Sequence, residues 1–212
     1  GNRIATLNES IRKIADFVHD YLIESGRTES ENDWEPKHRW EHTLRVAQWA
    51  FRLAAEEKAD IELCVVAALF HDVSHFVSED YRKHGVRSAE IAREFLLKNG
   101  YCDEFVRKAA YAIESHVGEI NPKTLEARIL QDADTLDRFG YFRILFLGKT
   151  AELSNLENLK QKISSSLAYL DRLEGGEFGP MWTETGEKKL IELLAINRTV
   201  QKGVLYELEN TK

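Results

Sequence analysis

A histidine and an aspartate, His71 and Asp72, stand side by side directly after an apolar run from Cys64 to Phe70. Such a run predicts a buried helix, and an imidazole and a carboxylate at its end lose hydration unless a partner binds them. A divalent metal satisfies both groups at once. The pair therefore indicates a metal site, which needs further ligands from other segments.

Two more candidate ligands lie on apolar helical stripes. His42 shares one helical face with Val46 and Trp49, so it is expected to point toward the core. Asp134 lies in the acidic segment 132–137, whose three carboxylates repel one another unless a cation or strong donors are near. Two imidazoles and two carboxylates suit Mn, Fe, Co, Ni or Zn and leave octahedral positions for water.

The elements that must position these residues are all predicted to be helical, because no segment alternates as a strand does and no internal repeat is present. The first helix is expected to end at Gly26, and loops are expected at 27–37, 75–85 and 118–123. The glycines at 175–176 and the Gly-Pro pair at 179–180 are expected to separate the last two helices. The helices are predicted at about 7–25, 39–58, 61–73, 86–99, 102–116, 125–140, 141–147, 152–174 and 184–208.

The composition is that of a soluble globular protein. The 212 residues suffice for one sizeable domain, and 43% of them are hydrophobic. No apolar stretch approaches the roughly 20 residues that cross a bilayer, and no signal peptide is recognisable, so we expect a cytoplasmic protein with no membrane partner. Cys64 and Cys102 are expected to be reduced. A net charge of −7 argues against a nucleic-acid polymer as partner and leaves room for a small phosphate ligand.

The order of these motifs resembles that of the HD-domain superfamily of metal-dependent phosphohydrolases. The resemblance rests on His42-Thr-Leu-Arg-Val, Ala67-Ala-Leu-Phe-His-Asp and Asp132-Ala-Asp-Thr-Leu-Asp, and it is strongest from about 38 to 140. It implies an all-α, bundle-like single HD domain over 1–212, which the helices at about 152–208 complete. It also implies that one metal is held by His42, His71, Asp72 and Asp134. Asp132 and Asp137 would then orient ligands or cap helices.

The resemblance also suggests roles for residues around this set. His84 and His116 fall where two-metal relatives place further ligands, with Asp72 as the bridge; the alternative is that they orient ligands or lie at the surface. His75 and Arg39 fall where relatives contact phosphate, the alternatives being a plain loop histidine and a solvated charge.

The implied mechanism is hydrolysis by a metal-activated water. Asp72 would orient the water, His75 or His84 would protonate the leaving oxygen, and Arg39, with Lys83 or Arg138, would hold phosphate oxygens. The lysine and the Gly-Tyr-Pro segment of cyclic-dinucleotide enzymes are missing, which argues against that substrate.

The sequence thus predicts a phosphohydrolase acting on a small phosphate substrate, a nucleotide by preference, with one or two divalent ions (Mn, Fe, Co, Ni, Zn or Mg). Nucleotidase, nucleotide pyrophosphohydrolase and phosphodiesterase activities all remain open. The rival hypotheses are a metal-binding, nucleotide-sensing module without turnover and a purely structural helical protein. The C-terminal helices are also candidates for homo-oligomer contacts.

Overall fold

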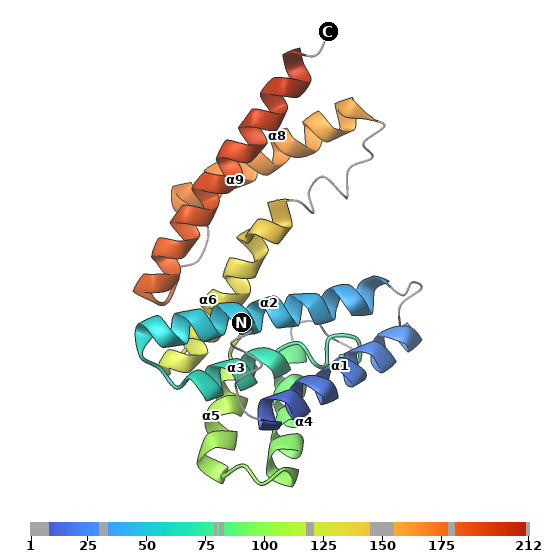
Figure 1. Ribbon diagram of the computed structural model, residues 1–212, viewed down its shortest axis with the longest axis vertical. Coiled ribbons are helices and arrows are strands. Elements are labelled where there is room, and N and C mark those ends of the chain that lie inside the picture. The colour runs from blue at the N-terminus through green and yellow to red at the C-terminus, as the bar shows by residue number, and fades with distance from the viewer. Residues whose placement is uncertain are drawn as a thin grey trace. The chain divides into compact units, whose positions relative to one another are not determined.

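A computed structural model describes residues 9–29, 34–78, 80, 83–117, 121–144, 155–177 and 181–210 (Figure 1). Every regular element in these ranges is a helix, which confirms the all-α prediction. The chain divides into two compact units, Gly1–Asp134 and Thr135–Lys212. None of the described helices combines the length and the apolarity that crossing a membrane requires.

The first unit is built around α3, Ile61–Phe70. Asp60 caps this helix by accepting a hydrogen bond from the Leu63 amide at 3.0 Å, and every residue from Leu63 to Phe70 is buried. A helix that is apolar all round needs neighbours on every side. It finds them in α1, α2, α4 and α5, and the chain passes directly from its end into the turn that contains His71 and Asp72.

The first two helices are longer than predicted. Helix α1, Glu9–Glu29, continues through Gly26, and α2, Trp34–Glu57, begins five residues before the predicted start, so most of the predicted loop at 27–37 is helical. The physical reason is that Gly26 does not end α1 but lets Pro36 pack closely against it. A side chain at position 26 would collide with Pro36. Pro36 is tolerated in the first turn of α2, where its missing N–H has no intrahelical partner to lose.

The next pair of helices brings the remaining histidines toward α3. Helix α4, His84–Lys98, begins two residues before the predicted start, so the predicted loop at 75–85 ends at Lys83. Gly100, with φ of +81°, closes the turn after α4, and α5 follows as Asp103–Glu114. Helix α3 itself ends at Phe70, three residues short of the prediction, and 71–77 form turns. The predicted turn at 118–123 lies partly outside the described residues.

Helix α6, Leu125–Phe139, agrees with its prediction and crosses the boundary between the units. Of the short helix predicted at 141–147, residues 141–144 are helical and the rest lie outside the described residues.

The second unit consists mainly of two long helices, α8 (Leu156–Arg172) and α9 (Glu184–Asn210), with a short π-helix, η3 (Leu173–Glu177), after α8. The glycines at 175–176 therefore lie in a helical turn, whereas the Gly-Pro pair at 179–180 falls outside the described residues. Arg198 pairs with Asp171 at 2.6 Å and with Glu174 at 2.8 Å, which ties α9 to the end of α8. That these helices complete one HD domain stays a prediction. Their apolar contact comprises Leu159, Ile163, Leu167, Val204, Leu205 and Leu208.

Two glycine substitutions test the explanation given for Gly26. Gly26→Ala is expected to destabilise the protein by about 1–3 kcal/mol, because the added methyl group overpacks the α1–α2 contact. Gly203→Ala, in α9, is the matched control: nothing lies within 4 Å of the added carbon, so higher helix propensity should stabilise by about 1 kcal/mol. Urea unfolding followed by circular dichroism measures both, and changes of the same sign would contradict the explanation.

Candidate metal centre

The carboxylate of Asp72 lies buried at the centre of a cluster of histidines in the first unit. Its Oδ2 accepts a hydrogen bond from Nη1 of Arg39 at 2.6 Å. The same oxygen lies 3.4 Å from Nε2 of His71 and 3.7 Å from Nε2 of His42. One side of the carboxylate therefore faces α2 and the end of α3.

The other oxygen of Asp72 faces a different pair of histidines. Oδ1 lies 2.9 Å from Nε2 of His84, the first residue of α4, and 3.5 Å from Nε2 of His116, which follows α5. These two imidazole nitrogens are 3.1 Å apart. Asp72 thus divides its two oxygens between two histidine pairs from different helices.

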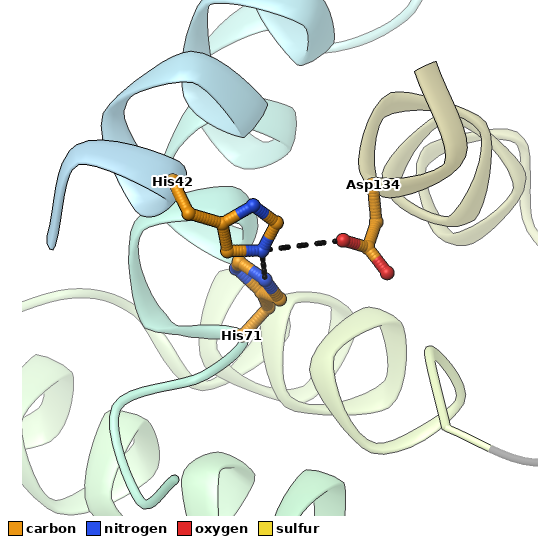
Figure 2. Close-up of side chains that lie close together, drawn as sticks. All are labelled: His42, His71 and Asp134. Atoms are coloured by element: carbon orange, nitrogen blue, oxygen red, sulfur yellow. Dashed lines mark hydrogen bonds and ion pairs between the residues drawn. The ribbon is translucent and has the colours of Figure 1, made fainter. Parts of the chain in front are cut away.

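Asp134 joins the first pair from the side of α6. Figure 2 shows the side chains of His42, His71 and Asp134 converging from α2, the turn after α3, and α6. Nε2 of His42 lies 3.3 Å from Nε2 of His71 and 3.3 Å from Oδ1 of Asp134. The side chains of His42 and Asp134 are 15% and 27% exposed, so a small ligand can reach this group from solvent.

Backbone hydrogen bonds fix the tautomers of two of the histidines. Nδ1 of His71 lies 2.7 Å from the Ala68 carbonyl, and Nδ1 of His116 lies 2.5 Å from the Ile113 carbonyl. A carbonyl only accepts, so each Nδ1 carries a proton, and Nε2 is the nitrogen left to donate to the cluster when it is protonated or to bind a metal when it is not. This is the arrangement that metal-binding histidines adopt, with one nitrogen held by an outer partner.

The donor set fits a divalent ion at two places. The ligand atoms of His42, His71 and Asp134 lie within 4.8 Å of one another, and so do those of His71, Asp72 and His116. Imidazole nitrogens and carboxylate oxygens together suit Mn, Fe, Co, Ni or Zn better than Mg.

Both candidate carboxylate ligands are held in the ionised state. Burial alone would raise the pKa of Asp72, but the charge of His71 and hydrogen bonds from the surrounding imidazoles hold it well below its usual range. Burial likewise opposes ionisation of Asp134, and His42 lowers the pKa of this group below its ordinary value. The cluster therefore presents two negative charges at neutral pH.

Arg39 and His75 lie together beside Asp72. Nη2 of Arg39 donates to Nε2 of His75 at 3.2 Å, while Nη1 binds Asp72. Burial, followed by the nearby guanidinium, lowers the pKa of His75 to about 4. His75 is therefore neutral at neutral pH, which makes it a weak proton donor unless a bound anion raises its pKa.

The other predicted residues have varied places. Asp132 is buried on α6, Lys83 is exposed at the start of α4, and Arg138 and Asp137 belong to the second unit, which the structure does not place relative to this cluster. The roles predicted for them stay predictions.

Two residues that sequence reasoning missed help to position the histidines. A Cβ on Gly85 would lie 3.0 Å from the Glu114 carbonyl and 3.3 Å from that of Ile113, so glycine lets the start of α4 approach the end of α5. Gln131 donates to the Ser115 carbonyl at 2.5 Å and so ties α6 to the residue before His116. The only signals in the sequence were the positions themselves, next to His84 and one helical turn before Asp134.

The buried imidazole of His75 gives a testable pH dependence. The unfolded chain binds a proton at His75 near pH 6.5, whereas the folded protein does so only near pH 4, so the free energy of unfolding should fall as the pH drops between these values. In His75→Gln this loss should be smaller by about 1–2 kcal/mol, allowing for solvent screening. Urea unfolding in chelator between pH 7 and 4 measures the difference, and parallel curves for the two proteins would contradict it.

Comparison with known proteins finds an HD domain in the part of the chain that carries this cluster. Residues 39–138 match the model of the HD domain family. Ribonuclease Y of Thermobifida fusca is 27% identical over 170 residues, which make up 79% of this chain and 32% of that protein. The chain thus spans about a third of the length of this relative.

Solved structures show the same fold. A predicted HD superfamily hydrolase from an uncultured Thermotogales bacterium is 27% identical, with a TM-score of 0.55, over 78% of this chain and 91% of that one. YpgQ of Bacillus subtilis, solved in complex with ADP, is 21% identical, with a TM-score of 0.59, over 95% of this chain and 97% of that one. The chain therefore contains an HD domain, residues 39–138, and shares its fold with solved hydrolases of the HD superfamily.

Proposed function

We propose that this protein is a metal-dependent phosphohydrolase that cleaves a phosphoester or phosphoanhydride bond of a nucleotide. Asp72 would hold two divalent ions together with the histidines on either side of it. The observation that carries the proposal is the division of this carboxylate between two histidine pairs, 2.9 and 3.5 Å from Oδ1 and 3.4 and 3.7 Å from Oδ2. If these histidines were only structural residues of the core, each could be satisfied by one hydrogen bond. They would not need to gather in pairs around one carboxylate.

The two ions would have different ligand sets. His42, His71 and Asp134 would hold the first ion together with Oδ2 of Asp72, and His84 and His116 would hold the second together with Oδ1. Ions at such a site supply an activated water and polarise a phosphoryl oxygen.

The side chains around the ions would bind and orient the phosphate. The guanidinium of Arg39 offers planar N–H donors that match phosphate oxygens, and it already lies between Asp72 and His75. A phosphate bound there would add negative charge beside His75 and raise the pKa of its imidazole. We therefore infer that His75 would protonate the leaving oxygen. His84 could not do so, because its Nε2 would be bound to an ion.

A nucleotide is the proposed substrate because the site combines a guanidinium that could bind phosphate with places for two metal ions, which suit phosphoryl chemistry. YpgQ, which shares the fold, binds ADP in its solved structure, so ADP belongs in any substrate panel. We also propose a cytoplasmic location, in keeping with the two free cysteines, Cys64 and Cys102.

A second candidate substrate is RNA. The similarity to Ribonuclease Y extends over 79% of this chain, beyond the HD domain alone. An RNA phosphodiester could be cleaved by the same two-ion arrangement. The net charge of −7 favours the small nucleotide, since a polymer needs a positively charged track along the surface.

Metal stoichiometry tests the two-ion arrangement. The protein is expected to bind two Mn²⁺ per chain, and His116→Ala is expected to bind one, because the second set then keeps only one imidazole. Isothermal titration of chelator-treated protein measures both. Binding of a single ion by the unaltered protein would contradict the bridging role of Asp72.

Product release tests the activity itself. Protein loaded with Mn²⁺ or Co²⁺ should release phosphate or pyrophosphate from a nucleotide, or shorter products from an RNA oligonucleotide, and Asp72→Ala should lower the rate at least about a thousandfold. Glu90→Gln, which alters an exposed ion pair on α4, is the matched control and should retain the full rate.

The same assay separates the rival functions. A sensing module would bind a nucleotide tightly without releasing a product, and a structural protein would bind neither metal nor nucleotide. Equal rates for Asp72→Ala and the unaltered protein would exclude the proposed mechanism.

A further inference from the structure

Two serines join the turn after the His-Asp pair to the start of α4. Ser74, two residues after Asp72, and Ser88, on the first turns of α4, are both completely buried. Oγ of Ser74 donates to the carbonyl of His84 at 2.8 Å and lies 3.0 Å from Oγ of Ser88. The backbone N–H of Ser74 donates to Oγ of Ser88 at 3.2 Å.

The hydrogens in this network can be assigned. The single hydroxyl proton of Ser74 goes to the His84 carbonyl, because a carbonyl cannot donate. Ser88 must therefore donate its hydroxyl proton to Ser74 while it accepts from the Ser74 amide. The two residues form a reciprocal pair, and the hydroxyl of Ser78 lies beside it, 3.3 Å from Oγ of Ser74.

The placement of this pair distinguishes it from ordinary buried serines. It binds the carbonyl of His84 on one side and lies two residues from Asp72 on the other, and these residues meet at 2.9 Å through their side chains. Ser115 is almost as buried and also lies near the cluster, but its hydroxyl donates to the Ala112 carbonyl of its own helix and joins no second segment.

We propose that Ser74 and Ser88 are positioning residues that hold His84 against Oδ1 of Asp72 and thereby set the affinity of the second ion. The inference rests on the two-ion function proposed above. It assigns a selective effect, because the pair holds the carbonyl of His84, which would serve the second ion alone. None of its side-chain hydrogen bonds reaches the side chains of His42, His71 or Asp134, which would serve the first ion.

Metal titration tests the proposal on the whole protein. Ser74→Ala and Ser88→Ala should each lower the affinity for the second Mn²⁺ by about 10-fold or more, because a partner that orients a ligand is lost. The affinity for the first Mn²⁺ should stay within about twofold of its original value. The double variant should be no weaker than the single ones, because the two hydroxyls act as a unit. Ser115→Ala is the matched control and should bind both ions with unaltered affinity.

Stability is measured alongside, because burial makes these serines part of the packing as well. The α4 helix keeps its apolar contacts through Ala89, Ala92 and Leu96, so the alanine variants should remain folded by circular dichroism. Ser74→Cys and Ser88→Cys fill the same volume with a weaker donor. The cysteine variants should therefore lose less affinity for the second ion than the alanine variants do.

Three results would overturn the proposal. The serine variants could lose affinity for both ions equally, they could bind both ions with unchanged affinity, or the unaltered protein could bind only one ion. If the unaltered protein binds two ions and the serine variants weaken only the second, the positioning role stands even when no nucleotide is hydrolysed. In that case the proposed hydrolase function fails by itself, so the two failures can be told apart.

Discussion

The buried carboxylate of Asp72 is the interaction on which the rest of the first unit depends. A carboxylate removed from water needs donors on both oxygens, and here they come from α2, the end of α3, the start of α4 and the end of α5. Four helices must therefore keep their ends in one place. The apolar helix α3, buried from Leu63 onward, supplies the rigid support from which the His-Asp pair extends.

Local contacts and long-range contacts contribute differently to this centre. His71 and His116 are each oriented by a carbonyl three residues earlier, so the chain itself aims their rings. The distances between the rings depend on how closely the helices approach, which Gly85 and Gln131 help to set. The orientation of these rings is thus set by the local backbone, and the distances between the rings are set by helix packing.

The sequence was sufficient to predict that these histidines and carboxylates come together and that the chain is helical. The apolar stripe beside His42, the run before His71 and the position of Asp134 are short-range patterns, and the structure brings these side chains together. Family order then pointed to His84 and His116, which lie 3.1 Å apart. These are the parts of the molecule that periodicity and motif order can specify.

Features that depend on contacts between distant segments could not be predicted. Gly26 looked like a helix end, because a close approach to Pro36 leaves no periodic signal. The pairing of Arg39 with Asp72 joins residues 33 positions apart. It places the guanidinium beside His75, where, after burial, this charge lowers the pKa of the imidazole. Neither consequence follows from propensity or composition.

The ion pair between Arg39 and Asp72 has a consequence for the charge balance of the first unit. In small zinc domains the metal supplies the folding energy, so removing it unfolds the chain. Here the chain carries its own cation, 2.6 Å from the carboxylate of Asp72, together with an apolar core around α3. The buried carboxylate therefore has a counter-ion from the chain itself, and its charge is balanced whether or not a metal is bound.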